Sequence, residues 1–511
     1  MAMAACLIPL LIALGVLNAG ADTIYEPVDF RPASVAASEG QTIDLIVSDE
    51  LERTPRHYLR IVATVNAEGP ARVALVLEDV LRREHASETV ELQGGDPGQI
   101  TMEVEQAAGR PVSMIRAVRL RHEGAAAEVS ELRLVCADES VPAPDVTVTG
   151  PRDETSIQQA LVSLGDQGGV VYVPAGEYVL GDEIVIPTGN LTIYGDGRDT
   201  IIQGTWVEAK GLFKATKLSN LRFTRLHLRS LPITHFRGYN EQQHVQPGDA
   251  GKPSVLSRGI TLEGCENVRV DHCEVELFGH AGVIFYGGTD NLVDHCFLHE
   301  NFRYGYGYGV ATPGTQELYI EDNNFENHRH GIAGNAGGAS YIARFNRLVK
   351  DAAVLPGWNQ NEAAVNQLRA HEIDAHAKCG WIYAHDNYVA MRNAIMGAGA
   401  MMRGNPGWLY RNVFESCSPA IYCIGNSDEV WTWDNEFVGC PSEEASKATG
   451  QIYFGQKPED FKEFPYPHHL NRLDWWPGAR SDARLRGKEE TLCAGPAEPA
   501  VLRLVKDGED Q

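Results

Sequence analysis

The chain repeats the stretch VRVDHCEVEL (268–277) as LVDHCFLHE (292–300), LYIEDNNFEN (318–327), YIARFNRLV (341–349), IYAHDNYVA (382–390), LYRNVFES (409–416) and VWTWDNEFV (430–438). Each copy is a short apolar strand, a Cys or Asn, and another strand, and glycine corners separate the copies. Alignment places one column at Cys273, Cys296, Asn323, Asn346, Asn387, Asn412 and Asn435, with steps of 23, 27, 23, 41, 25 and 23 residues. A strand repeat of this length without helices predicts a parallel β-solenoid. Amide side chains in equivalent turns can hydrogen-bond into a ladder.

Two departures from the regular step predict insertions. The 41-residue step contains one turn plus about 351–370, and a second insertion covers about 231–256. Insertions between solenoid turns collect on one side, where they can border a groove. We expect the solenoid over 154–445 and a C-terminal cap and tail over 446–511.

The ends and the composition limit the class of protein. Residues 1–21 contain the apolar run CLIPLLIALGVL and then Ala19-Gly20-Ala21, which is typical of a secretory signal peptide. We therefore expect a secreted or periplasmic protein, and no later run is apolar enough to span a membrane. The formal net charge of −25 argues against a nucleic-acid partner. A polyanionic substrate would need a locally basic groove or a bound cation.

The ten cysteines are too few for a disulfide scaffold in 511 residues. Cys273 and Cys296 occupy equivalent positions one turn apart, as do Cys417 and Cys440. Neighbouring parallel strands lie about 4.8 Å apart, so either pair is a disulfide or a pair of packed thiols.

Residues 23–138 have a different pattern. Their strands alternate apolar and polar residues at period two and are separated by turn signals, which predicts an antiparallel β-sandwich. It is either a carbohydrate-binding module or a structural spacer. A Pro-containing linker follows over 139–153. Then Ile157, Leu161 and Leu164 share one face of a short helix that would cover the open end of the solenoid, with Thr155 or Ser156 as N-cap.

The start of the second domain carries a family resemblance. A helix, the Gly168-Gly169 pair, VVYVPAGEY and NLTIYGDG resemble the beginning of pectin-lyase-like right-handed parallel β-helix proteins over about 150–445. The resemblance implies an all-β chain, with a right-handed parallel β-helix after the smaller sandwich. That fold hosts lyases, hydrolases, epimerases and non-enzymatic proteins alike.

One turn differs from its neighbours in its charge. It reads HEIDAHAKCGWIYAHDN from His371, whereas adjacent turns are rich in Ala, Gly and Met. With Ile373 aligned between Ile332 and Ile395, strand alternation places Glu372, Asp374, His376 and Lys378 together on the outer face. Arg329 has the same parity one turn earlier, and His330 shares a column with His371. The predicted catalytic residues are His371, Asp374, His376 and Arg329; the predicted substrate-binding residues are His330, Glu372, Lys378, Asn335, Tyr306 and Trp358.

Two other interpretations of this turn stay open. Glu-x-Asp-x-His-x-Lys is also compatible with an ordinary solvated strand face. A divalent cation such as calcium is a second option, because Asp374 and His376 can reach one ion, although no third ligand is evident and no cofactor is certain. His272 and His295 are predicted to stack on each other in neighbouring turns.

The segment His371-Glu-Ile-Asp-Ala-His resembles the catalytic motif of β-helix alginate C5-epimerases and lyases, Tyr-Gly-Phe-Asp-Pro-His. The resemblance carries Asp374 and His376 over directly and puts His371 in the place of the family's tyrosine. It implies a polysaccharide lyase or C5-epimerase acting on a uronic-acid-containing glycan. The alternatives are a glycoside hydrolase, using Asp374 with Glu372 or Glu321, and a non-catalytic carbohydrate-binding β-helix.

Overall fold

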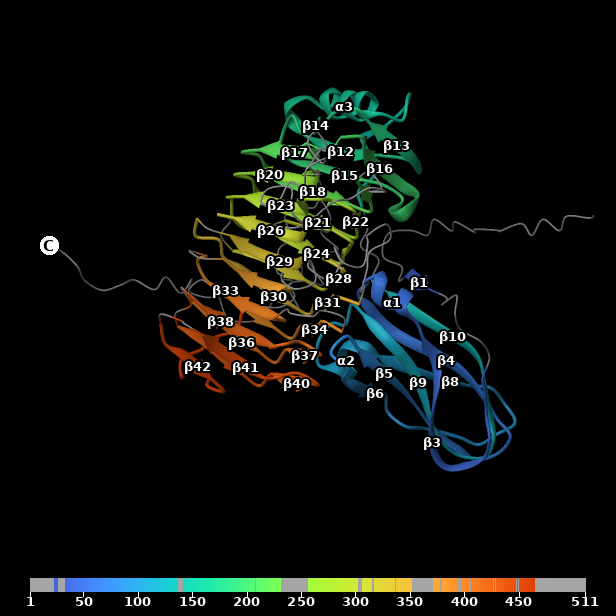
Figure 1. Cartoon of the computed structure of the whole chain (residues 1–511). Helices are drawn as coiled ribbons and strands as arrows, with labels where there is room; N and C mark the ends of the chain where they lie inside the picture. The colour runs from blue at the N-terminus through green and yellow to red at the C-terminus, as the bar shows by residue number, and fades with distance from the viewer. Residues whose placement is uncertain are drawn as a thin grey trace, which may run out of the picture.

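The chain forms a long parallel β-solenoid with a smaller antiparallel domain against its side (Figure 1). The computed structural model describes residues 23–25, 33–136, 141–206, 208–230, 256–301, 306–314, 317–335, 337–351, 371–376, 379–392, 398–403, 406–425, 427, 429–446, 448 and 450–464. Each solenoid turn contributes one strand to each of three sheets, which we call the first, second and third solenoid sheets. The expectation of an all-β chain with a right-handed parallel β-helix is confirmed.

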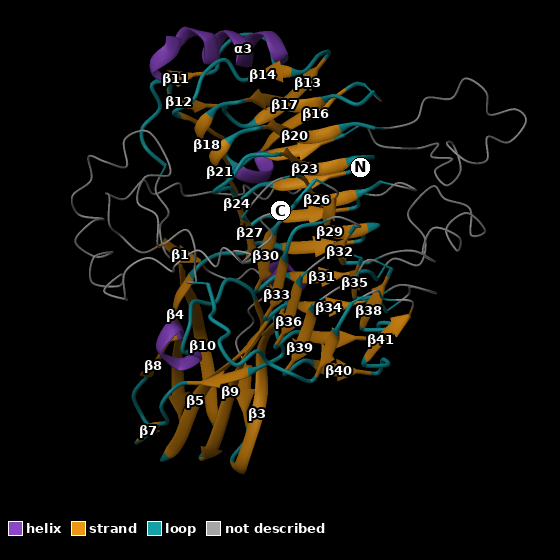
Figure 2. Ribbon diagram, turned by 90° about the vertical axis from the view of Figure 1, so that its left-hand side faces the viewer, coloured by secondary structure: helices purple, strands orange, loops and turns teal. Residues whose placement is uncertain are grey.

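The strands of each sheet follow in chain order, every one parallel to the next (Figure 2). The first sheet contains β11 (Val146–Thr147), β12 (Gly169–Tyr172), β15 (Leu191–Tyr194), β18 (Ser219–Thr224), β21 (Glu266–Asp271), β24 (Leu292–Asp294), β27 (Leu318–Glu321), β30 (Tyr341–Arg344), β33 (Ile382–His385), β36 (Gly407–Tyr410), β39 (Val430–Trp433) and β42 (Ile452–Phe454). The second contains β13 (Gly176–Leu180), β16 (Thr200–Gly204), β19 (His227–Arg229), β22 (Glu274–Glu276), β25 (Phe297–His299), β28 (Asn324–Glu326), β31 (Arg347–Val349), β34 (Tyr388–Ala390), β37 (Val413–Glu415) and β40 (Glu436–Val438). The third contains β14 (Ile184–Val185), β17 (Gly211–Thr216), β20 (Arg258–Glu263), β23 (Ala281–Tyr286), β26 (Tyr308–Pro313), β29 (His330–Asn335), β32 (Ile373–Ala375), β35 (Ala400–Met402), β38 (Ile421–Ile424) and β41 (Glu443–Ser446).

The predicted asparagine ladder is confirmed. Asn323, Asn346, Asn387 and Asn412 each donate from Nδ2 to Oδ1 of the next member, at 3.0–3.1 Å, and the ladder ends at Asn435. The 41-residue step joins two directly bonded members, so it is one turn plus an insertion.

The turn that carries the ladder has a left-handed residue in each repeat. The residue before each ladder position has φ between 51° and 56°, and these residues are His272, His295, Asp322, Phe345, Asp386, Arg411 and Asp434. Non-glycine residues rarely adopt this conformation, but it turns the chain sharply between the first and second sheets. The amide of the ladder residue can then donate to the next Asn Oδ1, as Asn387 does to Asn412 at 3.0 Å.

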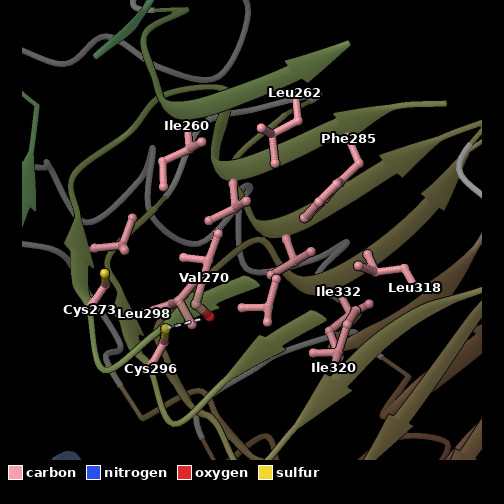
Figure 3. Packing of buried hydrophobic residues seen from close by; sticks show 14 of the residues in the cluster. Ile260, Leu262, Val270, Cys273, Phe285, Cys296, Leu298, Leu318, Ile320 and Ile332 are labelled. Atoms are coloured by element: carbon pink, nitrogen blue, oxygen red, sulfur yellow. Dashed lines mark hydrogen bonds between the residues drawn. The ribbon is translucent and has the colours of Figure 1, made fainter. Parts of the chain in front are cut away.

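The interior is a continuous apolar column of inward-facing side chains from all three sheets (Figure 3). Cys273 and Cys296 lie in it as free thiols, and the Cys296 Sγ is 3.5 Å from the carbonyl oxygen of Val270. Cys417 and Cys440 are free thiols too. The packed-thiol alternative therefore describes both pairs. The predicted stacking of His272 on His295 is confirmed, with ring centroids 5.1 Å apart.

The helix α3 (Glu154–Ser163) covers the N-terminal end of the solenoid (Figure 1). Ile157 and Leu161 are fully buried under it. The predicted N-cap is wrong: Asp153 is the cap, because its carboxylate accepts hydrogen bonds from the amides of Thr155 and Ser156. The carboxylate at this position can reach both free amides of the first turn. At the other end β41 and β42 continue the sheets to Phe454.

The N-terminal unit consists of two antiparallel sheets packed on a common core. One contains β1 (Thr23–Tyr25), β10 (Ala127–Cys136), β4 (Tyr58–Ala67), β8 (Gly98–Glu103) and β2 (Ala33–Val35); the other contains β3 (Ser38–Val47), β9 (Ile115–Gly124), β5 (Ala71–Asp79), β6 (Glu84–Ala86) and β7 (Val90–Leu92). Two short helices, α1 (Asp49–Arg53) and α2 (Val104–Ala108), connect strands.

This unit packs against the second solenoid sheet, beside β31, β34 and β37 (Figure 1). Val80, Leu81 and Met114 bury themselves against a patch that contains Phe345 and Tyr388. The turn between β5 and β6 is held by Asp79, which accepts from the amide of Leu81 at 2.8 Å. The contact leaves the third sheet on a different side of the solenoid.

Within the residues that the structure describes, no helix has the length and apolarity needed to cross a membrane. The predicted signal peptide, most of both insertions and most of the C-terminal tail lie outside the described residues, as do Lys378, Trp358 and Ile395.

Candidate functional site

A groove of about 290 Å³ runs along the outer face of the third solenoid sheet. Strands β20, β23, β26 and β29 and the residue after β32 form it. The described residues that line it are Arg258, His280, Ile284, Tyr286, Tyr306, Tyr308, Ala311, Pro313, Ala333, Asn335 and His376. None of these is an acid, although the chain carries a net charge of −25. The groove is therefore locally basic and aromatic, with a small-residue floor at Ala311 and Ala333.

Asp374, His376 and Arg403 form a compact cluster at one end of the groove. Strand β32 places Asp374 beside Ala333 of β29. The Asp374 Oδ2 lies 2.6 Å from Nδ1 of His376, and Nη2 of Arg403 lies 2.5 and 2.6 Å from the two carboxylate oxygens. The three side chains come from two neighbouring turns.

The three members of this cluster differ in exposure. Asp374 is fully buried, whereas the side chains of His376 and Arg403 are 26% and 27% exposed. Burial raises the pKa of Asp374, but His376, His330 and Arg403 outweigh it and hold that pKa well below its ordinary value. Asp374 is thus an ionised group that reaches the groove through His376. It lies on the outer face, not in the core, because Ile373 beside it occupies the apolar interior.

A stack of three rings lies beside this cluster. Tyr308, His330 and His371 follow one another on successive turns, with centroid separations of 5.6 and 5.0 Å and interplanar angles of 9° and 11°. His330 also meets His376 edge to face at 6.1 Å. Burial lowers the pKa of His371 to about 3, so this imidazole is neutral. The predicted shared column of His330 and His371 is confirmed, and His376 is the member that faces the groove.

Arg329 precedes this stack on β29 and is half-buried. It hydrogen-bonds the phenol of Tyr308, which lowers the pKa of that group, yet burial is the larger effect and raises it above its ordinary value. Tyr308 therefore keeps its proton. The Nε and Nη1 atoms of Arg329 have no hydrogen-bond partner.

The prediction that Glu372 faces outward with Asp374 is wrong. A side chain at Gly331 would meet Leu348 and the Glu372 carboxylate, so Glu372 points into the interior. Strand β32 begins only at Ile373, and the bend before it breaks the alternation. Both carboxylate oxygens of Glu372 are buried without a hydrogen-bond partner, and burial raises its pKa to about 7.

Glu372 interrupts a column of small residues. The neighbouring turns have Gly259, Gly282, Gly309 and Gly331 before it, and Gly399 after it. The pKa of the adjacent Lys350 is lowered to about 8 by burial, and its Nζ donates to the carbonyl oxygen of His328 at 2.8 Å.

The predicted register on the C-terminal side of the site is also wrong. Ile373 pairs with Ala400 rather than Ile395, and Asp374 pairs with Met401. The corrected register places Arg403 next to His376, where its amide donates to the Ala375 carbonyl oxygen at 2.8 Å. The sequence analysis missed Arg403 for this reason. A shift of the AIMGAGAMMR alignment by five residues would have found it.

Of the other predicted contacts, Asn335 and Tyr306 line the groove. Lys378 and Trp358 lie outside the described residues. The sequence analysis did not single out Arg258, His280 or Tyr286, which line the same groove. Their signal is their register, since each lies on or beside a third-sheet strand that precedes the charged turn.

The carboxylate pairs considered for a hydrolase do not flank the groove. Glu372 faces the interior, and Glu321 lies on the first sheet, where Arg344 Nε donates to its Oε1 at 2.9 Å. Among the described acids, Asp374 is the one that contacts a groove-lining residue at this end.

A possible metal-binding group lies on the second sheet, away from the groove. Glu276, His299 and Glu300 bring ligand atoms within 4.8 Å of one another. However, Nε2 of His299 lies 3.1 Å from Glu274 and Nδ1 lies 3.8 Å from Glu300, so the two nitrogens face different carboxylates. These acids raise the pKa of His299 to about 9, which describes a protonated imidazole in a salt-bridge network.

Comparison with known proteins supports the fold. Residues 146–353 match the family described as rhamnogalacturonase A/epimerase, pectate lyase-like. The solenoid is therefore a pectin-lyase-like β-helix, as the resemblance implied. The match ends before His371. No curated protein matches the chain.

Three similar solved structures illustrate the range of proteins with this architecture. ORF18 of Geobacillus virus E2 is 16% identical, with 59% of this chain and 57% of that chain covered and a TM-score of 0.39. The endo-xylogalacturonan hydrolase of Aspergillus tubingensis is 11% identical, with coverage of 62% and 97% and a TM-score of 0.37. The catalytic unit of a GH87 α-1,3-glucanase from Streptomyces thermodiastaticus is 11% identical, with coverage of 84% and 98% and a TM-score of 0.32. The chain thus spans 57% of the viral protein's length.

Proposed function

We propose that this protein is a carbohydrate-active enzyme that removes the proton next to the carboxylate of a uronic acid within a polysaccharide. The observation that carries the proposal is the His376–Asp374 pair at the end of a basic groove that no described acid lines. A polyuronate is an anion, so a groove with these properties can accept it despite the negative charge of the whole chain.

The geometry suggests a role for each group. Asp374 accepts the Nδ1 proton of His376, which leaves the lone pair on Nε2 for the groove, and a general base near neutral pH is the task that imidazole suits. Arg403 balances the charge of Asp374. Asp374 is thus a positioning residue, and His376 is the base.

The opposite partner in the reaction is assigned to Tyr308 and Arg329. Tyr308 lines the groove and keeps its proton, so it can supply one, and Arg329 hydrogen-bonds it. We assign the substrate carboxylate to Arg329, because a cation there makes the neighbouring proton more acidic. Loss of the 4-linked sugar after proton removal is a lyase reaction, and return of a proton on the other face is a C5-epimerase reaction. This assignment replaces His371, which lies neutral in the ring stack.

The test is a screen of the purified full chain against uronic-acid and neutral polysaccharides. A lyase yields an unsaturated end that absorbs ultraviolet light, and an epimerase yields solvent deuterium in uncleaved uronate. His376→Ala and Asp374→Asn are expected to lower turnover about 100-fold or more while the thermal midpoint stays near wild type.

The matched control is His272→Ala, which breaks a similar His–Asp pair on the first sheet, where Nδ1 lies 2.8 Å from Asp271. It should leave turnover unchanged. New reducing ends without ultraviolet absorbance would show a hydrolase and reject the proposal, as would full turnover by both site variants.

A further inference from the structure

The end of the groove far from His376 contains a second cluster that the proposed reaction does not use. Arg258 lies at its centre: its Nε donates to Nδ1 of His280 at 2.9 Å, and its guanidinium carbon lies 5.3 Å from the ring centroid of Tyr286. Tyr306 meets His280 edge to face at 4.5 Å. All four residues line the groove.

These contacts fix the orientation of the guanidinium group. One nitrogen is occupied by His280 and one face is covered by Tyr286, while the side chain is only partly buried. The Nη pair has no protein acceptor among the contacts of Arg258. A planar guanidinium held this way presents two parallel N–H donors, which is the geometry that binds a carboxylate bidentately.

The distance from the reacting end excludes one sugar ring as the common ligand. Arg258 pairs with Ala281, Ala281 with Tyr308, and Tyr308 with His330, and His330 stacks on His371. Four strand steps of about 4.8 Å amount to about 19 Å. A ligand that touches both ends is an extended chain of several sugar units.

We propose that Arg258 binds the carboxylate of a second uronic acid, several units away from the unit that loses its proton. The substrate is then a continuous run of uronates, and isolated uronates in a neutral chain bind poorly. This inference rests on the proposed function for the identity of the polymer, but the binding it describes can be measured without turnover.

The experiment uses the full chain with His376→Ala, so that no substrate is consumed. Titration calorimetry measures binding of polyuronate oligomers of increasing length, and of the same oligomers with their carboxylates methyl-esterified. Adding Arg258→Met should weaken binding of long acidic oligomers about tenfold or more, and leave dimers and esterified oligomers unaffected. Arg258→Lys should restore part of the affinity, because it keeps the charge but not the paired donors. Arg72→Met, which removes an exposed charge from the N-terminal unit, is the matched control.

The outcomes separate the two proposals. Equal affinity of Arg258→Met and its parent for long acidic oligomers overturns the inference, as does an equal loss on esterified oligomers. If wild type turns over no polyuronate but Arg258→Met still weakens acidic-oligomer binding selectively, the second carboxylate site stands and the proposed reaction is rejected.

Discussion

Replacing Asn387 with alanine tests whether the ladder holds the solenoid together. Asn387 Nδ2 donates to the carbonyl oxygen of Ala343 at 2.9 Å and to Asn412 at 3.0 Å, while its Oδ1 accepts from the amide and the Nδ2 of Asn346 at 3.1 and 3.0 Å. Truncation leaves two buried backbone groups unpaired, the Asn346 amide and the Ala343 carbonyl. At about 1–3 kcal/mol each, with partial relaxation, the expected loss in unfolding free energy is about 2–4 kcal/mol.

The control for this variant is Asn435→Ala at the end of the ladder. Asn435 is half-buried, so water can replace much of what it provides, and we expect a loss of about 1 kcal/mol. Urea unfolding followed by tryptophan fluorescence gives both values from the midpoint shift at constant m. A loss at Asn387 below about 0.5 kcal/mol, or no larger than at Asn435, would refute the view that the bonds add along the stack.

Two other variants test the interior and the domain contact. Glu372 has a pKa raised to about 7 against an ordinary value of 4.5. The folded state therefore holds its proton more tightly, and wild-type stability should fall as pH rises from about 4.5 through about 7. Glu372→Gln should remove this fall, so equal pH profiles for both proteins would contradict the assignment. Residues 23–138 expressed alone should melt cooperatively but bind a hydrophobic dye through the uncovered Val80, Leu81 and Met114. Leu81→Asp should abolish that dye binding, and a fragment without a melting transition would show that this unit needs the solenoid to fold.

The sequence predicted the solenoid well, because its signal is periodic. Each copy of the repeat contains the ladder residue, and the residues beside it occupy equivalent places in every turn. Asn346 and Asn387 were therefore correctly matched across 41 residues. The left-handed residue before each ladder position was not predicted, since Phe345 and Arg411 have no residue type in common with His272.

The site was predicted less completely for local reasons. Alternation fixes the outward direction of Asp374, but it does not hold through the bend that turns Glu372 inward. Arg403 depends on the register across a Gly-rich segment, where several alignments are equally apolar. The contact of Leu81 with Tyr388 joins positions far apart in the chain and leaves no periodic trace.

The stacking of equivalent turns makes the solenoid a ruler. Groups in one column are separated by whole multiples of a strand step, so the span between Arg258 and the Tyr308–His330–His371 stack is set by the number of turns between them. Gain or loss of one complete turn between them would lengthen or shorten the recognised substrate by one fixed increment. The reacting end would keep its local geometry, because each turn contacts only its neighbours.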